Sequence, residues 1–215
     1  TGIAVAFPRS PMVSAAVAYE LADNTGGRFR LGLGSQVKAH IERRYSAEFD
    51  RPAARLRDYV QAVQACWRAF NREERLAHDG EFYQMSLLPR DWSPKAHDHP
   101  MKVDISAVGP IMTRVAGEVA DGVHVHPLHS TPYIENRLKP DLAKGAAKAS
   151  RSVDDIDLII PVFACPGDTP EEREPYVAHA KRQIAFYGST PNYAFQFDDL
   201  GYEGTTQRIR AKMKA

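Results

Sequence analysis

The sequence has few cysteines, almost no net charge and no long apolar run. Its 2 cysteines, Cys66 and Cys165, lie far apart, which argues against a disulfide framework or a metal motif and favours buried thiols in a reducing compartment. The 28 Lys and Arg residues are balanced by 27 Asp and Glu residues, so no net field attracts nucleic acid or anionic lipid. No stretch reaches the roughly 18 apolar residues of a membrane span. We therefore expect a soluble, cytoplasmic protein whose partner is a small molecule, not nucleic acid or a membrane.

What the sequence does contain is a regular alternation of short β-type runs and helical patterns. Ser10 before Pro11 and Thr169 before Pro170 are N-cap and first-turn signals. Residues 72–100, rich in charge and proline, break the alternation and are predicted to be an insertion over one end of the core. The strands are predicted at residues 2–7, 28–34, 101–107, 122–126 and 156–165, and the helices at about 11–25, 53–70, 110–120, 131–147 and 170–187.

Five βα units in succession predict a parallel sheet, because parallel strands are joined by crossover helices. Right-handed crossovers place all the helices on one side if the sheet curls towards a barrel, whereas a doubly wound sheet is the alternative. A complete eightfold barrel needs about 250 residues. The prediction is therefore an α/β fold of the (β/α)8 TIM-barrel type that is incomplete, forming one domain over residues 1–215 with an insertion at about 72–100.

Six stretches stand out in chain order: Arg9-Ser10-Pro11-Met12, residues 26–34, Gly80-Glu81-Phe82-Tyr83, Ala107-Val108-Gly109-Pro110, Ala120-Asp121-Gly122 and residues 186–193. Together they resemble the luciferase-like monooxygenase family. Residues 186–193 are similar to a stretch in a branch of the family that uses coenzyme F-420. The resemblance implies an oxidoreductase that binds coenzyme F-420 or FMN, and a homodimer in the full-length protein. It also implies that the chain is a fragment with barrel strands three to seven, without strands one, two and eight.

Active sites of such barrels lie at the carboxyl ends of the strands. Ala107, Val108, Gly109 and Pro110 lead from a strand into a helix, where backbone N–H groups can bind an anion, although a plain helix-starting turn is the alternative. The resemblance implies that these four residues hold the cofactor phosphate.

The resemblance also implies that Thr1 and Gly2 back the cofactor ring, at a place where related proteins carry a bulge. Ser35 and His40 follow the second strand, and His40 falls where family members place a polar residue near the cofactor. Val37 replaces an acidic residue of the sugar-phosphate-oxidising relatives, which argues against that substrate.

Two histidines, His124 and His126, alternate on one predicted strand and so point to the same side, with His129 just beyond. Such a pair holds metal in some hydrolases, but no partner cluster of acids appears at the other strand ends. We therefore predict no metal site, and take His126 and His40 as the candidate catalytic residues, as proton donor or acceptor.

The leading hypothesis is an F-420-dependent oxidoreductase that transfers a hydride to or from a small organic substrate. An FMN-dependent monooxygenase on the same scaffold is the nearest alternative. From other classes come a metal-dependent hydrolase that uses His124 and His126, and a non-catalytic barrel fragment. Because much of the reactive end is predicted to lie outside this chain, we do not expect activity from the fragment alone.

Overall fold

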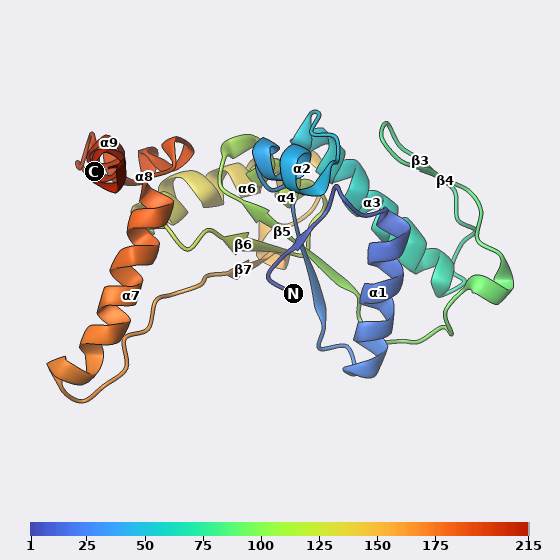
Figure 1. The fold of residues 1–215 in the computed structure, drawn as a ribbon. Helices are drawn as coiled ribbons and strands as arrows, with labels where there is room; N and C mark the ends of the chain where they lie inside the picture. Colours follow the sequence, from blue (N-terminus) through green and yellow to red (C-terminus); the bar gives the residue numbers. More distant parts are fainter. Residues whose placement is uncertain (215) are drawn as a thin grey trace. The chain divides into compact units, whose positions relative to one another are not determined.

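The computed structural model describes residues 1–214, which form two compact units (Figure 1). The first unit comprises Thr1–His124 and Asp141–Ile159, and the second comprises Val125–Pro140 and Ile160–Ala215. Within the described part of the chain, no helix is both long and apolar enough to cross a membrane.

A five-stranded sheet in the order β1-β2-β5-β6-β7 is the centre of the first unit. Neighbouring strands run parallel, with Leu33 of β2 opposite Ile105 of β5, so the predicted parallel α/β class is confirmed. The strands are β1 (Ala4–Val5), β2 (Arg30–Gly34), β5 (Lys102–Ala107), β6 (Gly122–Val125) and β7 (Asp157–Ile159).

The predicted strand at residues 156–165 is too long. Only Asp157–Ile159 pairs with a neighbour, and residues 160–165 adopt no regular structure. Pro161 lacks the N–H that a ladder needs, and Val162 is 78% exposed. The apolar composition of this run was misleading, because a strand needs a neighbouring strand as well as apolar side chains.

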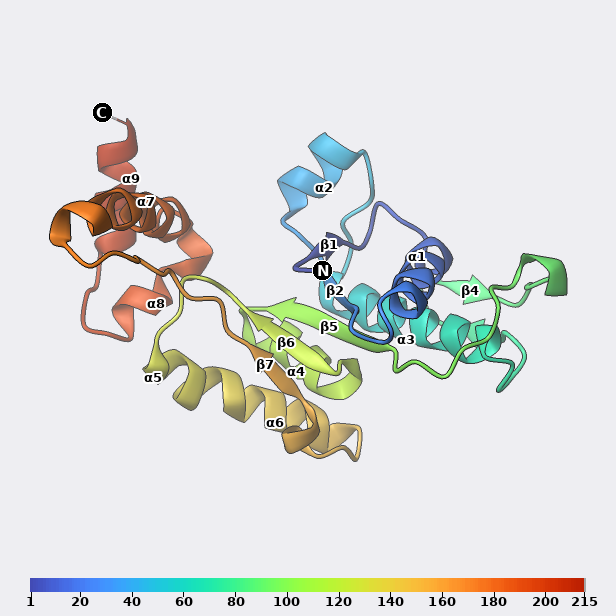
Figure 2. The ribbon, with the colours of Figure 1, turned by 90° about the horizontal axis from the view of Figure 1, so that it is seen from below.

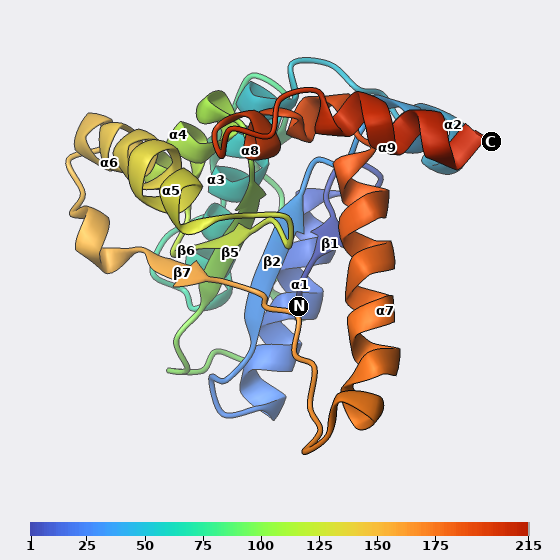
Figure 3. The same cartoon turned by 90° about the vertical axis from the view of Figure 1, so that its left-hand side faces the viewer.

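Three helices cover one face of the sheet: α1 (Pro11–Asn24), α3 (Pro52–Phe70) and α4 (Pro110–Val119), with α3 packed between the other two (Figures 2 and 3). The N-cap predicted at Ser10 is confirmed, because its side chain accepts from the backbone N–H of Met12. Helices on one face are the arrangement of a barrel wall, whereas a doubly wound sheet carries helices on both. The apolar side chains of the strands that face these helices are buried: Leu31, Leu33, Val103, Ile105 and Val123.

Helix α4 packs closely on α6 (Lys139–Lys148) through two glycines. A Cβ on Gly117 would lie 2.3 Å from the carbonyl oxygen of Leu142, and a Cβ on Gly145 would lie 2.0 Å from that of Arg114. The helix predicted at residues 131–147 is otherwise present as three consecutive segments, α5 (Thr131–Tyr133), the π-helical η2 (Ile134–Leu138) and α6.

The insertion between α3 and β5 carries a short antiparallel hairpin, β3 (His78–Asp79) and β4 (Gln84–Met85), followed by a 3-10 turn, η1 (Arg90–Trp92). The buried carboxylate of Asp58 on α3 accepts from the backbone N–H of Phe82 at 2.6 Å and of Tyr83 at 3.0 Å. The hairpin is thus fastened to α3 by backbone donors.

The second unit is helical. Helix α7 (Pro170–Gly188) is capped by Thr169, whose side chain accepts from the N–H of Glu172, as predicted. Four further helical segments were not predicted, and the first of them lies in the first unit: α2 (Lys38–Tyr45), η4 (Pro191–Tyr193), α8 (Phe195–Asp198) and α9 (Thr205–Lys214). A further 3-10 turn, η3 (Val153–Asp155), precedes β7 in the first unit.

Candidate functional site

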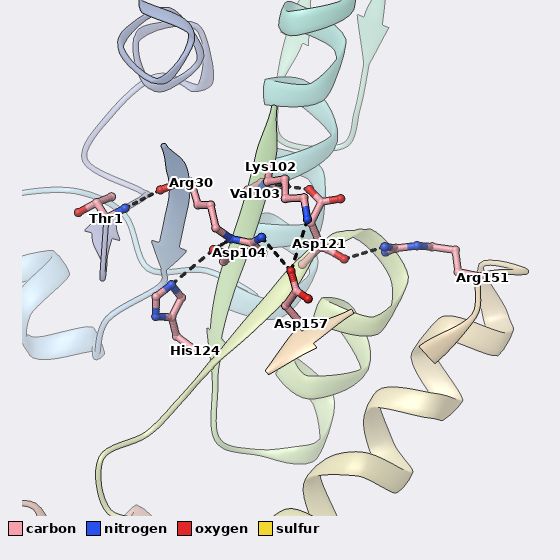
Figure 4. Close-up of polar contacts among 10 residues, drawn as sticks. Thr1, Arg30, Lys102, Val103, Asp104, Asp121, His124, Arg151 and Asp157 are labelled. Atoms are coloured by element: carbon pink, nitrogen blue, oxygen red, sulfur yellow. Dashed lines mark hydrogen bonds and ion pairs between the residues drawn. The ribbon is translucent and has the colours of Figure 1, made fainter. Parts of the chain in front are cut away.

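The face of the sheet opposite α1, α3 and α4, called here the inner face, carries an ion network (Figure 4). Arg30 Nε donates to Asp104 Oδ2 at 2.9 Å, and its second nitrogen, Nη2, pairs with Asp104 Oδ1. Arg30 Nη1 donates to Asp157 Oδ2 at 2.8 Å, and His124 Nε2 lies 3.6 Å from Asp104 Oδ2. Because side chains alternate along a strand, Arg30 and Asp104 point away from the helices while their neighbours enter the core.

The electrostatics of this network follow from burial and pairing. The side chain of Asp104 is 1% exposed, and its hydrogen bond raises the pKa of Arg30. Burial lowers the pKa of His124, against the opposing effect of Asp104. Burial acts to raise the pKa of Asp157, but the Arg30 hydrogen bond and the Lys102 charge outweigh it and hold that pKa low. The network is therefore a charged Arg–Asp cluster beside a histidine that favours its neutral form.

Thr1 and Gly2 lie on the inner face, beside the middle of β2. A Cβ on Gly32 would lie 2.0 Å from the Thr1 carbonyl oxygen, and a Cβ on Gly2 would lie 3.3 Å from Cε1 of His124. The peptide bond between Gly2 and Ile3 is cis. Gly32 therefore allows the first residues of the chain to lie directly on the sheet.

Residues 107–110 and Ser35 lie at the carboxyl edge of the sheet. Since Leu33 is opposite Ile105, Ser35 leaves β2 beside the end of β5. Gly109 is the N-cap of α4 in an extended conformation, without a side-chain cap hydrogen bond, and a Cβ there would meet nothing within 4 Å. Pro110 has no N–H, so the N–H groups of Ile111 and Met112 are the first-turn donors without an intrahelical acceptor. This edge offers the open, donor-rich geometry that an anion needs.

The predicted site residues Ser35 and His40 both follow β2. Ser35 Oγ donates to the carbonyl of Gln36 at 3.2 Å, and His40 is exposed in the first turn of α2. Ser35 is three residues beyond Gly32, which is roughly 10 Å along a strand. Thr1 and Gly2 therefore lie about this far from the edge formed by residues 107–110.

His126 belongs to the second unit and directly follows β6. The backbone N–H of Leu128 donates to His126 Nδ1 at 3.0 Å. Its ring packs against Tyr187, with centroids 4.7 Å apart, and against Tyr193, with centroids 4.3 Å apart. Burial, chiefly, and the nearby His129 lower the pKa of His126.

The two histidines predicted to face the same side have different partners. His124 lies in the Arg30–Asp104 network, and His126 lies between two tyrosines. Among residues 1–214, no group of three or more His, Cys, Asp or Glu side chains is arranged to hold a metal ion.

The sequence interpretation missed Arg30, Asp104 and Asp157. A signal was available for all three, because each falls within a predicted strand at a position that alternates with apolar residues. Charges inside strands of a buried sheet require partners, and charges of opposite sign on neighbouring strands can supply them.

Comparison with known proteins agrees with this architecture. The profile of the luciferase-like monooxygenase family matches residues 1–215. The chain belongs to this family. An uncharacterised protein of Mycobacterium tuberculosis (strain ATCC 25618 / H37Rv) is 37% identical over 203 residues, covering 94% of this chain and 60% of that protein. An F420-dependent glucose-6-phosphate dehydrogenase of Nocardia farcinica is 32% identical over 152 residues, covering 67% of this chain and 42% of that enzyme.

The fold also matches that of a solved structure. The coenzyme F420 dependent tetrahydromethanopterin reductase from Methanopyrus kandleri matches with a TM-score of 0.65 at 19% identity, over 97% of this chain and 65% of that chain. This likeness confirms the TIM-barrel-type fold predicted from the sequence. The chain spans no more than 60% of the length of the two curated relatives described above.

Proposed function

We propose that the protein to which this chain belongs is a coenzyme F-420-dependent oxidoreductase that moves a hydride between the deazaflavin and a small organic substrate. The observation that carries the proposal is the carboxyl edge of the sheet, where Gly109 opens onto the first turn of α4 in a chain of the luciferase-like family. Two of the related proteins described above are named for this coenzyme.

The residues present fit the phosphate end of such a cofactor. The first-turn N–H groups of Ile111 and Met112 would hold the phosphate, and Gly109 leaves room for it because no atom beyond Gly109 and its two chain neighbours lies within 4 Å of where its Cβ would be. When bound, the deazaflavin supplies two-electron hydride chemistry. The inner face, with Thr1 and Gly2 against Gly32, is the surface that we assign to the ring, and His40 and Ser35 are assigned to the surroundings of the cofactor.

The substrate that we propose is not a sugar phosphate. Val37, exposed at the start of α2, brings no acidic group to the position where sugar-phosphate-oxidising relatives carry one. An FMN-dependent monooxygenase is the second candidate, because FMN also carries a phosphate that the same edge would accept.

Titration of the full-length protein with F-420 and, separately, with FMN tests the proposal by absorbance and fluorescence. We expect saturable binding of F-420 with an affinity clearly above that for FMN. A higher affinity for FMN would favour the FMN-dependent monooxygenase over the F-420-dependent enzyme. Binding of neither cofactor would overturn both candidates.

The position of the phosphate is tested by a matched pair of variants at Gly109. Its extended backbone suits an N-cap residue, and both Asp and Asn are good N-caps, so Gly109→Asp and Gly109→Asn should fold as well as the parent. Only Asp adds a negative charge, and like charges a few Å apart oppose each other by about 1–4 kcal/mol. We expect Asp to weaken F-420 binding at least about tenfold more than Asn does. Equal dissociation constants for the two variants would place the phosphate elsewhere.

We also propose that the full-length protein is a homodimer. This proposal rests on the family resemblance. Sedimentation equilibrium of that protein should give twice the mass of one chain. A monomer across the measured concentration range would contradict it.

A further inference from the structure

The ring of His126 is held in one orientation by a hydrogen bond from the backbone of Leu128, and its backbone carbonyl is bound by His129. The N–H of Leu128 donates to Nδ1 of His126 at 3.0 Å, while Nδ1 of His129 donates to the carbonyl oxygen of His126 at 2.9 Å. A ring nitrogen that accepts a hydrogen bond carries no proton, so the single proton of a neutral imidazole must be on the other nitrogen. His126 is therefore fixed as the Nε2–H tautomer.

The surroundings of the ring favour this neutral state. The titratable groups that face it are those of His129, Tyr187 and Tyr193, and none of them is a carboxylate. Tyr187 meets the ring at 81° between planes, and Tyr193 lies at 43° to it, so two aromatic walls flank the imidazole. Protonation of Nδ1 would break the Leu128 hydrogen bond and place a charge between these walls.

We propose that His126 acts as a neutral hydrogen-bond donor, presenting Nε2–H to a carbonyl-type oxygen of the substrate, with Tyr187 and Tyr193 against the apolar part of that molecule. His126 follows β6 directly, at the carboxyl end where barrels bind their ligands. This role for His126 rests on the proposed function, because it needs a substrate at the carboxyl end of β6. The sequence left open whether His126 donates or accepts a proton. The Nε2–H tautomer decides for a hydrogen-bond donor, because a nitrogen that already bears its proton cannot serve as a general base.

The tautomer is tested first, in the full-length protein labelled with 15N-histidine. The His126 signals are assigned by their loss in His126→Gln, and a long-range 1H–15N spectrum separates protonated from unprotonated ring nitrogens. We expect Nε2 protonated and Nδ1 unprotonated at pH 7, with the ring still neutral below pH 6.5. An Nδ1–H tautomer, or a charged ring at pH 7, would overturn the proposal.

The donor role is tested with acetophenone and ethylbenzene as probes, which share an aromatic ring but differ in the carbonyl oxygen. We expect acetophenone to shift the His126 Nε2–H signal and ethylbenzene to leave it unchanged. His126→Gln retains a side-chain N–H donor, whereas His126→Phe retains only a ring, so acetophenone binding should persist in the first and fall at least fivefold in the second. Equal responses to both probes, or no response to either, would overturn the donor role.

The two proposals can fail separately. If F-420 does not bind the full-length protein while the tautomer and the probe response are as expected, the proposed function fails and the donor site stands. If F-420 binds and the tautomer is the opposite one, only the inference about His126 is wrong.

Discussion

The carboxylate of Asp58 lies 2.6 Å from Nε2 of His78, and this contact joins the insertion to helix α3. The same carboxylate accepts the N–H groups of Phe82 and Tyr83, and a Cβ on Gly80 would lie only 1.8 Å from it. One buried acid thus organises a hairpin whose two strands have only two residues each. A hairpin this short is not stable by its own ladder.

Asp58→Asn should therefore loosen the insertion. The amide keeps one acceptor oxygen but places an NH2 group where a backbone N–H donates, so we expect a loss of about 2–4 kcal/mol in the free energy of unfolding. Urea unfolding followed by circular dichroism measures the loss. Asp79→Asn, at an exposed position of β3, is the matched control and should change stability by less than about 0.5 kcal/mol. Equal stability of the two variants would show that Asp58 does not hold the hairpin.

The hairpin link also shows where sequence interpretation ends. Local signals located α1, α3 and α7, because a cap residue and an apolar period act within a few residues of each other. The partnership of Asp58 and His78 joins residues 20 apart, and each had only the pattern of an ordinary polar residue. Helix α2 was missed for a related reason, since Ile41 is its single buried residue and gives no period to detect.

The candidate site likewise has one part that local sequence signals predict and one part that they do not. The carboxyl edge at residues 107–110 could be anticipated, because a strand, a glycine and a helix start follow one another in the chain. The Arg30–Asp104 pair spans 74 residues, and its register depends on which strands become neighbours in the sheet. Strand order is a property of the whole fold, and no local pattern carries it.

Histidine protonation should make the chain less stable in mild acid. The pKa of His126 is lowered from 6.5 in the folded state, so below that pH the unfolded chain binds a proton that the folded chain refuses. The stability that the chain gains from a neutral His126 is complete above pH 6.5. It is lost as the pH falls towards the lowered pKa of the folded state, and the free energy of unfolding then decreases by at most about 1.4 kcal/mol per pH unit.

His126→Gln removes this contribution, so the loss of stability between pH 7 and pH 5.5 should be smaller in the variant than in the parent. Chemical unfolding at several pH values measures the slopes. At pH 8 the histidine is neutral in both states, which provides an internal reference for any packing loss caused by the substitution. A slope unchanged from that of the parent would mean that His126 charges freely in the folded chain.

The two cysteines should differ sharply in reactivity. Burial raises the pKa of the Cys66 thiol to about 12, so at pH 8 about one molecule in ten thousand carries the reactive thiolate there. Cys165, in contrast, is partly exposed in the second unit. A chromogenic disulfide reagent should titrate one thiol of the parent rapidly, and the second only after denaturant is added. In Cys165→Ser the fast phase should disappear, and a fast phase that persists would contradict the burial of Cys66.

The contact between α4 and α6 should reverse the usual effect of replacing a helical glycine. In an ordinary helix interior, Gly→Ala stabilises by about 1 kcal/mol. A Cβ on Gly117 would lie 2.3 Å from the carbonyl oxygen of Leu142 and 2.8 Å from the backbone nitrogen of Ala146, and neither backbone atom can rotate away as a flexible side chain would. We expect Gly117→Ala to destabilise the chain by about 1–3 kcal/mol, the range for an overpacked core.

Gly109→Ala, where the added Cβ meets nothing within 4 Å, is the matched control and should change stability by under about 1 kcal/mol. Thermal unfolding of both variants decides the point, because a Gly117→Ala chain as stable as its control would mean that the two helices do not pack through this glycine.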